Sequence, residues 1–217
     1  MDDKTLIPHA LYASGNLNVA DQSNDDLDIL RDCHTSVIHC PLVYSRNGQL
    51  LKSFGRYRKH GINMCMGTDT FPTDFFKNIR AGSALAMSVD SDCRSNYYKA
   101  FYEAATIGGA KALGRDDLGK LAKGAKADYI VVDLSGFHIG VCDEDPIRTM
   151  CMCANGNDIT HVVINGRKVM NDRIIPDFDY EQVKFKAQQY YEKMKASFME
   201  RSSFSKEKFY QNSYRLK

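Results

Sequence analysis

Tryptophan is absent from these 217 residues, and no apolar run approaches the roughly 20 residues that span a bilayer. The N-terminal segment, Met1-Asp2-Asp3-Lys4, is acidic and lacks the apolar stretch of a signal peptide. Positive and negative charges nearly balance, because 29 Lys and Arg and 27 Asp and Glu give a net charge of +2. This balance gives no electrostatic reason to expect a nucleic-acid or membrane partner.

Cysteine spacings typical of a disulfide framework or a metal knuckle are also missing. The seven cysteines are odd in number, and Cys151 and Cys153 are too close to form a Cys-x-x-Cys pair. Reduced thiols, and hence a cytoplasmic location, are the expectation. The zinc signature of nucleoside deaminases is therefore excluded, and no Gly-x-Ser-x-Gly, His-Glu-x-x-His, phosphate-loop or dinucleotide motif is present.

What is present in the first half is an alternation of short apolar runs and helical patterns. We expect strands at about residues 5–9, 36–40 and 62–68. We expect helices at 24–30, at 50–57 with a stop at His60-Gly61, and from Thr73 or Asp74 to about Val89. Strands and helices alternating at this spacing indicate βαβ units with parallel pairing.

The pattern changes in the second half. Residues 97–113 are Ala-rich and helical, 128–134 read as a buried strand, and Asp145-Pro146 opens a helix. Asn165-Gly166 lies between two apolar runs at 161–170, which is the strongest short signal for a hairpin. A charged amphipathic helix is expected from Tyr180 to about Arg201.

Polar groups end three of the expected strands: His9, His39 and Asp69. Parallel strands place their carboxyl ends on one rim, where α/β barrels hold catalytic groups. A carboxylate at this rim can bind zinc or accept a proton. Each residue also has a plain structural interpretation, with Asp69 as a helix cap, His9 as a satisfied structural histidine and His39 as a residue that orients the loop before Pro41.

The loop after the second expected strand contains Arg46-Asn47-Gly48. It is either a solvated turn or a rim loop that contacts substrate. Both interpretations stay open from the residues alone.

Taken in order, these segments resemble the amidohydrolase superfamily, in the branch of cytosine, guanine and adenosylhomocysteine deaminases and triazine chlorohydrolases. The segments that carry the resemblance are residues 6–10, 37–46, 67–74, 104–114 and 118–128 and the hairpin at 163–167. The resemblance implies an α/β fold: a partial (β/α)8 TIM barrel, strands six to eight with their helices, followed by the C-terminal part of a small β-sandwich. The implied boundaries are 1–114 for the barrel portion, 115–175 for the sandwich portion and 176–217 for a C-terminal helix and tail.

The resemblance also implies roles for the strand-end residues. Asp69 is expected to be a metal ligand and proton shuttle, and His9 to contact the attacking water or the substrate. His39 and Arg46 are expected to bind substrate. The implied cofactor is a divalent metal, zinc ahead of iron, and the implied reaction is hydrolysis of a nitrogen heterocycle by deamination or dechlorination. Dimers are common among such relatives, so a homodimer is expected as well.

The sequence departs from that family at two motifs, the His-x-His pair of strand one and the His-x-x-Glu of strand five. The six histidines are at positions 9, 34, 39, 60, 138 and 161, and none of them belongs to either motif. We therefore expect a fragment that needs a complementary N-terminal half, does not retain the metal alone and is inactive alone. The alternatives are a non-catalytic binding or regulatory remnant of the fold and an unrelated small doubly wound α/β module.

Overall fold

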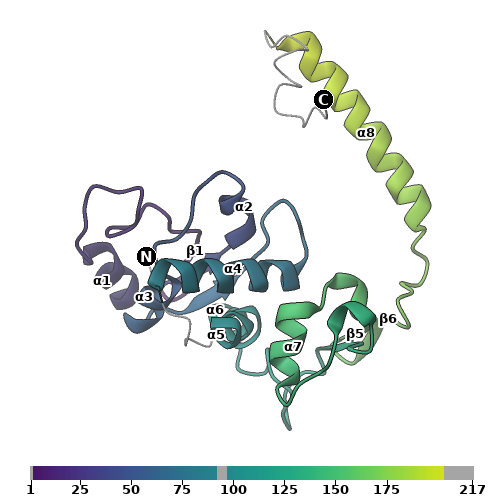
Figure 1. The fold of residues 1–217 in the computed structure, drawn as a ribbon, viewed down its shortest axis with the longest axis horizontal. Coiled ribbons are helices and arrows are strands. Elements are labelled where there is room, and N and C mark those ends of the chain that lie inside the picture. The colour runs from purple at the N-terminus through teal and green to yellow at the C-terminus, as the bar shows by residue number, and fades with distance from the viewer. Residues whose placement is uncertain (1, 92–96, 203–217) are drawn as a thin grey trace. The chain divides into compact units, whose positions relative to one another are not determined.

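The structure is a computed structural model that describes residues 2–91 and 97–202 (Figure 1). The chain divides into two compact units, Met1–Ile174 and Ile175–Lys217. The last part of the expected C-terminal segment, 203–217, lies outside the described residues. Across the described ranges, none of the helices is both long and apolar enough to cross a membrane.

The first unit begins with a three-stranded parallel sheet in the order β1-β2-β3. Its strands are β1 (Leu6–Pro8), β2 (Ser36–His39) and β3 (Met64–Met66). Ile7 is paired with Val37, and Ile38 with Cys65. The parallel pairing expected from the alternating pattern is therefore confirmed, with strands shorter than predicted.

Helices connect these strands, as expected for βαβ units. They are α1 (Asp25–Asp32), α2 (Pro41–Ser45), α3 (Phe54–Lys59) and α4 (Phe75–Asp90). The predicted start of the second helix near residue 50 was wrong, because Ser53 caps α3 by accepting a hydrogen bond from the amide of Arg56. The short helix α2 was not predicted, although Pro41 at its first turn is a recognised start signal. Of the two predicted caps, Thr73 and Asp74, it is Asp74 that caps α4.

The core lies between this sheet and the helices. Leu27, Val37, Phe54, Tyr57 and Phe101 are almost completely buried. The rings of Phe54 and Phe101 stack with centroids 4.1 Å apart. These contacts hold the helices against the sheet, so the carboxyl ends of the strands are supported by well-packed side chains.

A single helical run follows, made of α5 (Tyr97–Glu103), a π-helical turn η1 (Ala104–Gly108) and α6 (Gly109–Ala112). It packs against β3, and the approach is closest at Gly108. A Cβ atom on Gly108 would lie 2.3 Å from the carbonyl oxygen of Met64. The glycine is required there because any side chain would collide with the strand backbone.

A second, antiparallel sheet has the order β4-β5-β6. It consists of β4 (Tyr129–Val132), β5 (Ile159–Ile164) and β6 (Arg167–Met170). Asn165 and Gly166 form the predicted turn, both with positive φ. The prediction of a buried strand at 128–134 was wrong, because β4 is an edge strand and Tyr129, Ile130 and Val131 are 40–47% exposed.

Between β4 and β5 the chain forms a 3-10 turn η2 (Phe137–Ile139), the helix α7 (Pro146–Cys153) and a 3-10 turn η3 (Gly156–Asp158). Helix α7 packs against α4 and α5 (Figure 1). This contact places the segment between β4 and β5 next to helices α4 and α5.

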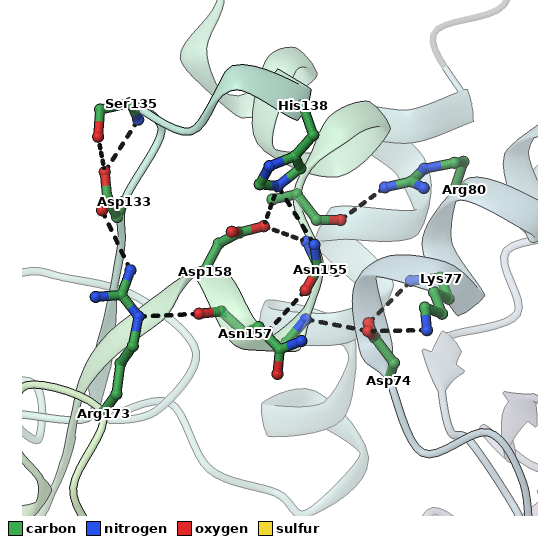
Figure 2. A network of polar contacts seen from close by, with 12 residues as sticks. Asp74, Lys77, Arg80, Asp133, Ser135, His138, Asn155, Asn157, Asp158 and Arg173 are labelled. Atoms are coloured by element: carbon green, nitrogen blue, oxygen red, sulfur yellow. Dashed lines mark hydrogen bonds and ion pairs between the residues drawn. The ribbon is translucent and has the colours of Figure 1, made fainter. Parts of the chain in front are cut away.

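A polar network fastens α4 to the segment before β5 (Figure 2). Asp74 accepts hydrogen bonds from the amides of Lys77 (3.1 Å) and Gly156 (3.0 Å). Arg80 donates to the carbonyl oxygen of Ala154 at 2.6 Å. The buried carboxylate of Asp158 lies 3.0 Å from Nε2 of His138 and accepts the amide of Asn155 at 2.8 Å. The loop that carries Asp69 therefore continues directly into an anchored helix start.

The second unit contains helix α8 (Tyr180–Arg201), capped by Asp179, which accepts from the amide of Gln182. Its position matches the prediction, and none of its residues is buried.

Candidate active site at the carboxyl ends of the parallel strands

The three polar residues predicted at strand ends lie in adjacent positions at one edge of the sheet. His39 is the last residue of β2, His9 follows β1 directly, and Asp69 follows β3 by three residues. Because the strands are parallel and neighbouring, their carboxyl ends meet at the same edge.

His9 and Asp69 face each other across this edge. Nε2 of His9 is 3.6 Å from Oδ2 of Asp69, and the two side chains are 29% and 35% exposed. This distance is longer than a hydrogen bond. The two groups are thus close without being bonded directly, and solvent or a ligand can reach both.

Backbone conformation at both residues is unusual. His9 has a φ of 77° and Asp69 a φ of 53°, a region that residues other than glycine seldom adopt. The amide of His9 donates to the carbonyl oxygen of Ile38 at 2.7 Å, and the amide of Gly67 donates to that of His39 at 3.0 Å. Such local strain persists where surrounding structure fixes it, which is common at functional sites.

A buried polar pair fixes the loop that follows His9. The carbonyl oxygen of Ala10 accepts from Tyr57 Oη at 2.8 Å and from Asn16 Nδ2 at 3.1 Å. Asn16 and Tyr57 are fully buried. Neither residue was predicted as part of the site, because their role depends on contacts between segments that are distant in the sequence.

Tyr44 is a further residue that sequence reasoning missed. Its ring meets the ring of His9 edge-on, with centroids 4.5 Å apart and planes at 86°. Tyr44 belongs to α2, so the overlooked helix start at Pro41 was the available signal. The contact restricts the orientation of the His9 ring.

Among the described residues, no hydrogen bond or ion pair links His39 to His9 or Asp69. Its side chain is 6% exposed, and its ring lies 5.9 Å from the rings of both Phe54 and Phe101. Burial, reinforced by the nearby His9, lowers the pKa of His39 to about 4. His39 is therefore neutral at pH 7, and its surroundings are those of a core residue.

Arg46 lies beside the loop of Asp69. Its Nη2 is 3.5 Å from Oγ1 of Thr70, and its guanidinium carbon lies 5.6 Å from the ring centroid of Phe71. The loop after β2 and the loop after β3 therefore touch each other next to the carboxylate of Asp69.

A cavity of about 430 Å³ borders the site on the side of β1. His9, Tyr12, Tyr44 and Asp26 line it together with apolar residues of β1, of the loop after β1 and of α1. Its volume suits a small organic ligand. Asp69 is not among its lining residues, so the cavity adjoins the histidine side of the pair.

His9 and Asp69 are side chains of the kinds that bind divalent metals, but two ligands are too few for a catalytic site. Two ligands about 2.1 Å from a tetrahedral zinc lie roughly 3.4 Å apart, close to the separation of Nε2 and Oδ2. Catalytic zinc takes three protein ligands, however, and residues 2–91 and 97–202 contain no group of three or more His, Cys, Asp or Glu side chains placed for a metal. The nearby Cys40 is not a ready third ligand, because burial and Asp69 raise the pKa of its thiol to about 11.

A model of the amidohydrolase family matches residues 1–169. The chain belongs to the amidohydrolase family. The resemblance inferred from the strand-end motifs is thereby confirmed.

Curated relatives within this family are deaminases. The chain is 31% identical over 168 residues to a 5-methylthioadenosine/S-adenosylhomocysteine deaminase of Acetivibrio thermocellus, a match that covers 75% of this chain and 39% of that protein. It is 30% identical over 166 residues to a 5'-deoxyadenosine deaminase of Methanococcoides burtonii, covering 74% and 38% respectively. The amidohydrolase chain thus spans about two fifths of the length of these relatives.

Solved structures share the fold. An adenosine deaminase from Xanthomonas campestris with bound zinc superposes with a TM-score of 0.78 at 23% identity, over 90% of this chain and 43% of that one. Atrazine chlorohydrolase from Arthrobacter aurescens TC1, complexed with zinc, superposes with a TM-score of 0.68 at 22% identity, over 87% and 41%. The alternative of an unrelated doubly wound module is therefore wrong.

Proposed function

We propose that this chain supplies part of the active site of a metal-dependent amidohydrolase that hydrolyses a C–N bond, or a C–Cl bond, of a nitrogen heterocycle. The observation that carries the proposal is the 3.6 Å approach of His9 Nε2 to Asp69 Oδ2 at the carboxyl edge of a parallel sheet. Family membership supports the reaction class, since the matched relatives are deaminases.

In this proposal β1, β2 and β3 are strands six to eight of a (β/α)8 barrel. The barrel portion is residues 1–114, the C-terminal part of a β-sandwich is 115–175, and the terminal helix with its tail is 176–217. The open edge of β1 and the exposed face of β4 support this assignment, because both leave backbone or apolar surface that a complete barrel and sandwich would cover. The proposed partner is an N-terminal half of the barrel, and a homodimer of the assembled enzyme is proposed as well.

Asp69 is proposed as the one metal ligand that this chain provides, with the remaining ligands coming from the complementary half. The donor set supports zinc, with iron as the alternative, and a chain with so few ligands is proposed not to retain the ion alone. When bound, such an ion acts as a Lewis acid and lowers the pKa of water.

The residues of this chain then have separate tasks. The carboxylate of Asp69 accepts the proton of the attacking water and passes it to the leaving amine. His9, oriented by Tyr44, hydrogen-bonds the water or a ring nitrogen through Nε2. His39 was predicted to bind substrate, but its burial favours a structural role at the end of β2. Arg46 is proposed to contact the substrate at the rim.

An adenosine-derived compound is the proposed substrate class. The relatives are named for 5-methylthioadenosine, S-adenosylhomocysteine and 5'-deoxyadenosine. The cavity beside His9 and Tyr44 is lined mainly by apolar residues, with Asp26 as a polar group, and is large enough for a purine ring.

A second candidate function is a binding or regulatory remnant of the fold without catalysis. The observation that favours it is the shortage of metal-binding groups among residues 2–91 and 97–202. In this case the rim would hold a heterocycle but would not hydrolyse it.

Co-expression separates the two candidates. The portion of the Acetivibrio thermocellus deaminase that this chain does not match is co-expressed with the 217-residue chain, and ammonia release from 5'-methylthioadenosine is measured with zinc. We expect zinc-dependent ammonia release that the substitution Asp69→Asn abolishes. A stable complex without turnover would support the remnant instead, and turnover that survives Asp69→Asn would overturn the role proposed for Asp69.

A further inference from the structure

Helix α8 carries an exposed apolar stripe that the proposed function does not use. Successive residues of an α-helix are turned by about 100°, and this rotation places six large side chains of α8 within an arc of about 100°. They are Tyr180, Val183, Tyr190, Tyr191, Met194 and Phe198. Each of the six is 42–69% exposed, so the stripe is a surface that a ligand or partner can reach.

The four lysines of α8 border the stripe, two on each side. One pair lies within about 40° of the edge formed by Tyr191, and the other lies within about 60° of the edge formed by Tyr190. The pairs are Lys184 with Lys195 and Lys186 with Lys193, respectively. The ammonium group of Lys195 lies 5.8 Å from the ring centroid of Tyr191, and that of Lys193 lies 5.8 Å from the ring centroid of Tyr190. Positive charge is therefore held at both edges of the stripe.

The acidic side chains of α8 are on the side away from the stripe. Glu181, Glu192 and Glu200 are each turned at least about 80° from both edges. Lys195 also contacts Glu192 at 3.8 Å, an i,i+3 ion pair on the surface that contributes little. The near balance of charge over the whole chain gave no reason to expect a membrane partner, but along this helix the two signs are separated.

We propose that α8 binds the surface of a membrane that contains anionic lipids. An apolar face bordered by lysines is typical of helices that lie in the plane of the membrane interface. The stripe enters the headgroup region, and the lysine stems extend along it so that the ammonium groups stay at the level of the lipid phosphates. Tyrosine suits this depth because its ring is apolar and its hydroxyl group is polar. The proposal is independent of His9 and Asp69.

A second copy of the chain fits the same stripe less well than an anionic membrane does. When two helices pair along an apolar seam, the residues that flank the seam face one another, so lysines of one α8 would meet lysines of the other. No leucine or isoleucine occurs between Tyr180 and Arg201, although these residues form most coiled-coil seams. An anionic lipid surface instead complements all four lysines.

Vesicle sedimentation tests the contribution of the lysines on the full 217-residue chain. Vesicles of phosphatidylcholine with about one third phosphatidylserine are compared with vesicles of phosphatidylcholine alone at fixed ionic strength. We expect the chain to bind the anionic vesicles, and Lys184→Gln with Lys193→Gln to weaken this binding by about fivefold per lysine. The matched control, Lys120→Gln with Lys123→Gln, changes the net charge equally at exposed lysines of the first unit and should bind like the wild type.

A second pair of variants tests the stripe itself. Tyr190→Ala with Met194→Ala should weaken binding to the anionic vesicles by at least about tenfold, because both side chains lose apolar surface that the interface would bury. Phe185→Ala is the control on the same helix. Phe185 is 64% exposed but is turned about 120° from the nearer edge of the stripe, so its removal should leave binding unchanged.

Several results would overturn the proposal while leaving the site at His9 and Asp69 intact. They are the absence of binding, equal binding to both kinds of vesicle, and a lysine variant that binds like its control. Dimerisation seen by light scattering and abolished by Tyr190→Ala with Met194→Ala would assign the stripe to a second copy instead. Loss of vesicle binding when the chain assembles with the complementary half of the barrel would assign the stripe to a contact within the enzyme.

Discussion

Nε2 of His9 lies 3.6 Å from Oδ2 of Asp69, at the ends of two strands that do not pair with each other. A second histidine–aspartate pair in the chain is different. Nε2 of His138 is 3.0 Å from Oδ2 of Asp158, within hydrogen-bond distance, and Asp158 also accepts an amide of its own loop. The polar atoms of His9 and Asp69 stay open to a ligand, whereas His138 and Asp158 are within hydrogen-bond distance of each other.

Helix packing against β3 gives a prediction about stability. Gly108→Ala places a Cβ atom 2.3 Å from the carbonyl oxygen of Met64, so the helix or the strand must shift. We expect the free energy of unfolding to fall by about 3 kcal/mol, as for a severe overpacking substitution. Urea unfolding followed by circular dichroism measures this change.

The neighbouring glycine provides the matched control. Gly109 has a helical φ of −62°, and a Cβ atom added to it would meet nothing within 4 Å, so Gly109→Ala should stabilise the helix by up to about 1 kcal/mol. Equal effects of the two substitutions would contradict the close contact with β3.

The buried His39 predicts a pH dependence of stability. Its pKa is about 4 in the folded chain and about 6.5 in the unfolded chain, so the unfolded chain binds the additional proton between these values. Stability should therefore fall as the pH decreases from about 6.5 to about 4, by at most about 3 kcal/mol. His39→Gln should flatten this part of the profile.

A second histidine serves as the control for that experiment. His34 is exposed and has positive φ, which asparagine tolerates, so His34→Asn should leave the profile unchanged. Carboxylates with lowered pKa, such as Asp133 at about 2, lose their contribution only at lower pH. A profile that keeps its slope in His39→Gln would show that another group causes it.

The link between α4 and the segment before β5 predicts a graded effect at Asp74. Asp74→Ala removes the helix cap and the bond to the amide of Gly156, and should lower the free energy of unfolding by about 2 kcal/mol. Asp74→Asn keeps a capping oxygen and should cost less than about 1 kcal/mol. Hydrogen exchange at Gly156 should become faster in the alanine variant; unchanged exchange would mean that the bond does not hold this segment.

Much of the first sheet was predictable because its signals are local. The apolar runs before His9 and His39 and the Gly-Thr-Asp sequence before Thr70 predicted these side chains at the carboxyl ends of the strands, where the structure has them. Asn165-Gly166 identified the hairpin for a similarly local reason, the need for positive φ in a tight turn.

Properties that depend on distant contacts were not predictable from those signals. The exposure of β4 depends on its place at a sheet edge, which an apolar run alone does not reveal. Tyr44 reaches His9 through a helix of five residues, and the contacts of Asn16 and Tyr57 with Ala10 join separate segments. The burial of His39 among phenylalanines likewise comes from packing between helices and sheet.

The most direct measurement is a titration of the 217-residue chain with Co²⁺, followed by nuclear magnetic resonance of labelled histidine and aspartate side chains. If Asp69 binds the ion and His9 lies beside it, the signals of both residues should broaden first, with weak affinity, and Asp69→Asn should abolish the effect. The His138 and Asp158 pair serves as the internal reference. Broadening that begins at this second pair, or that is unchanged by Asp69→Asn, would contradict the account.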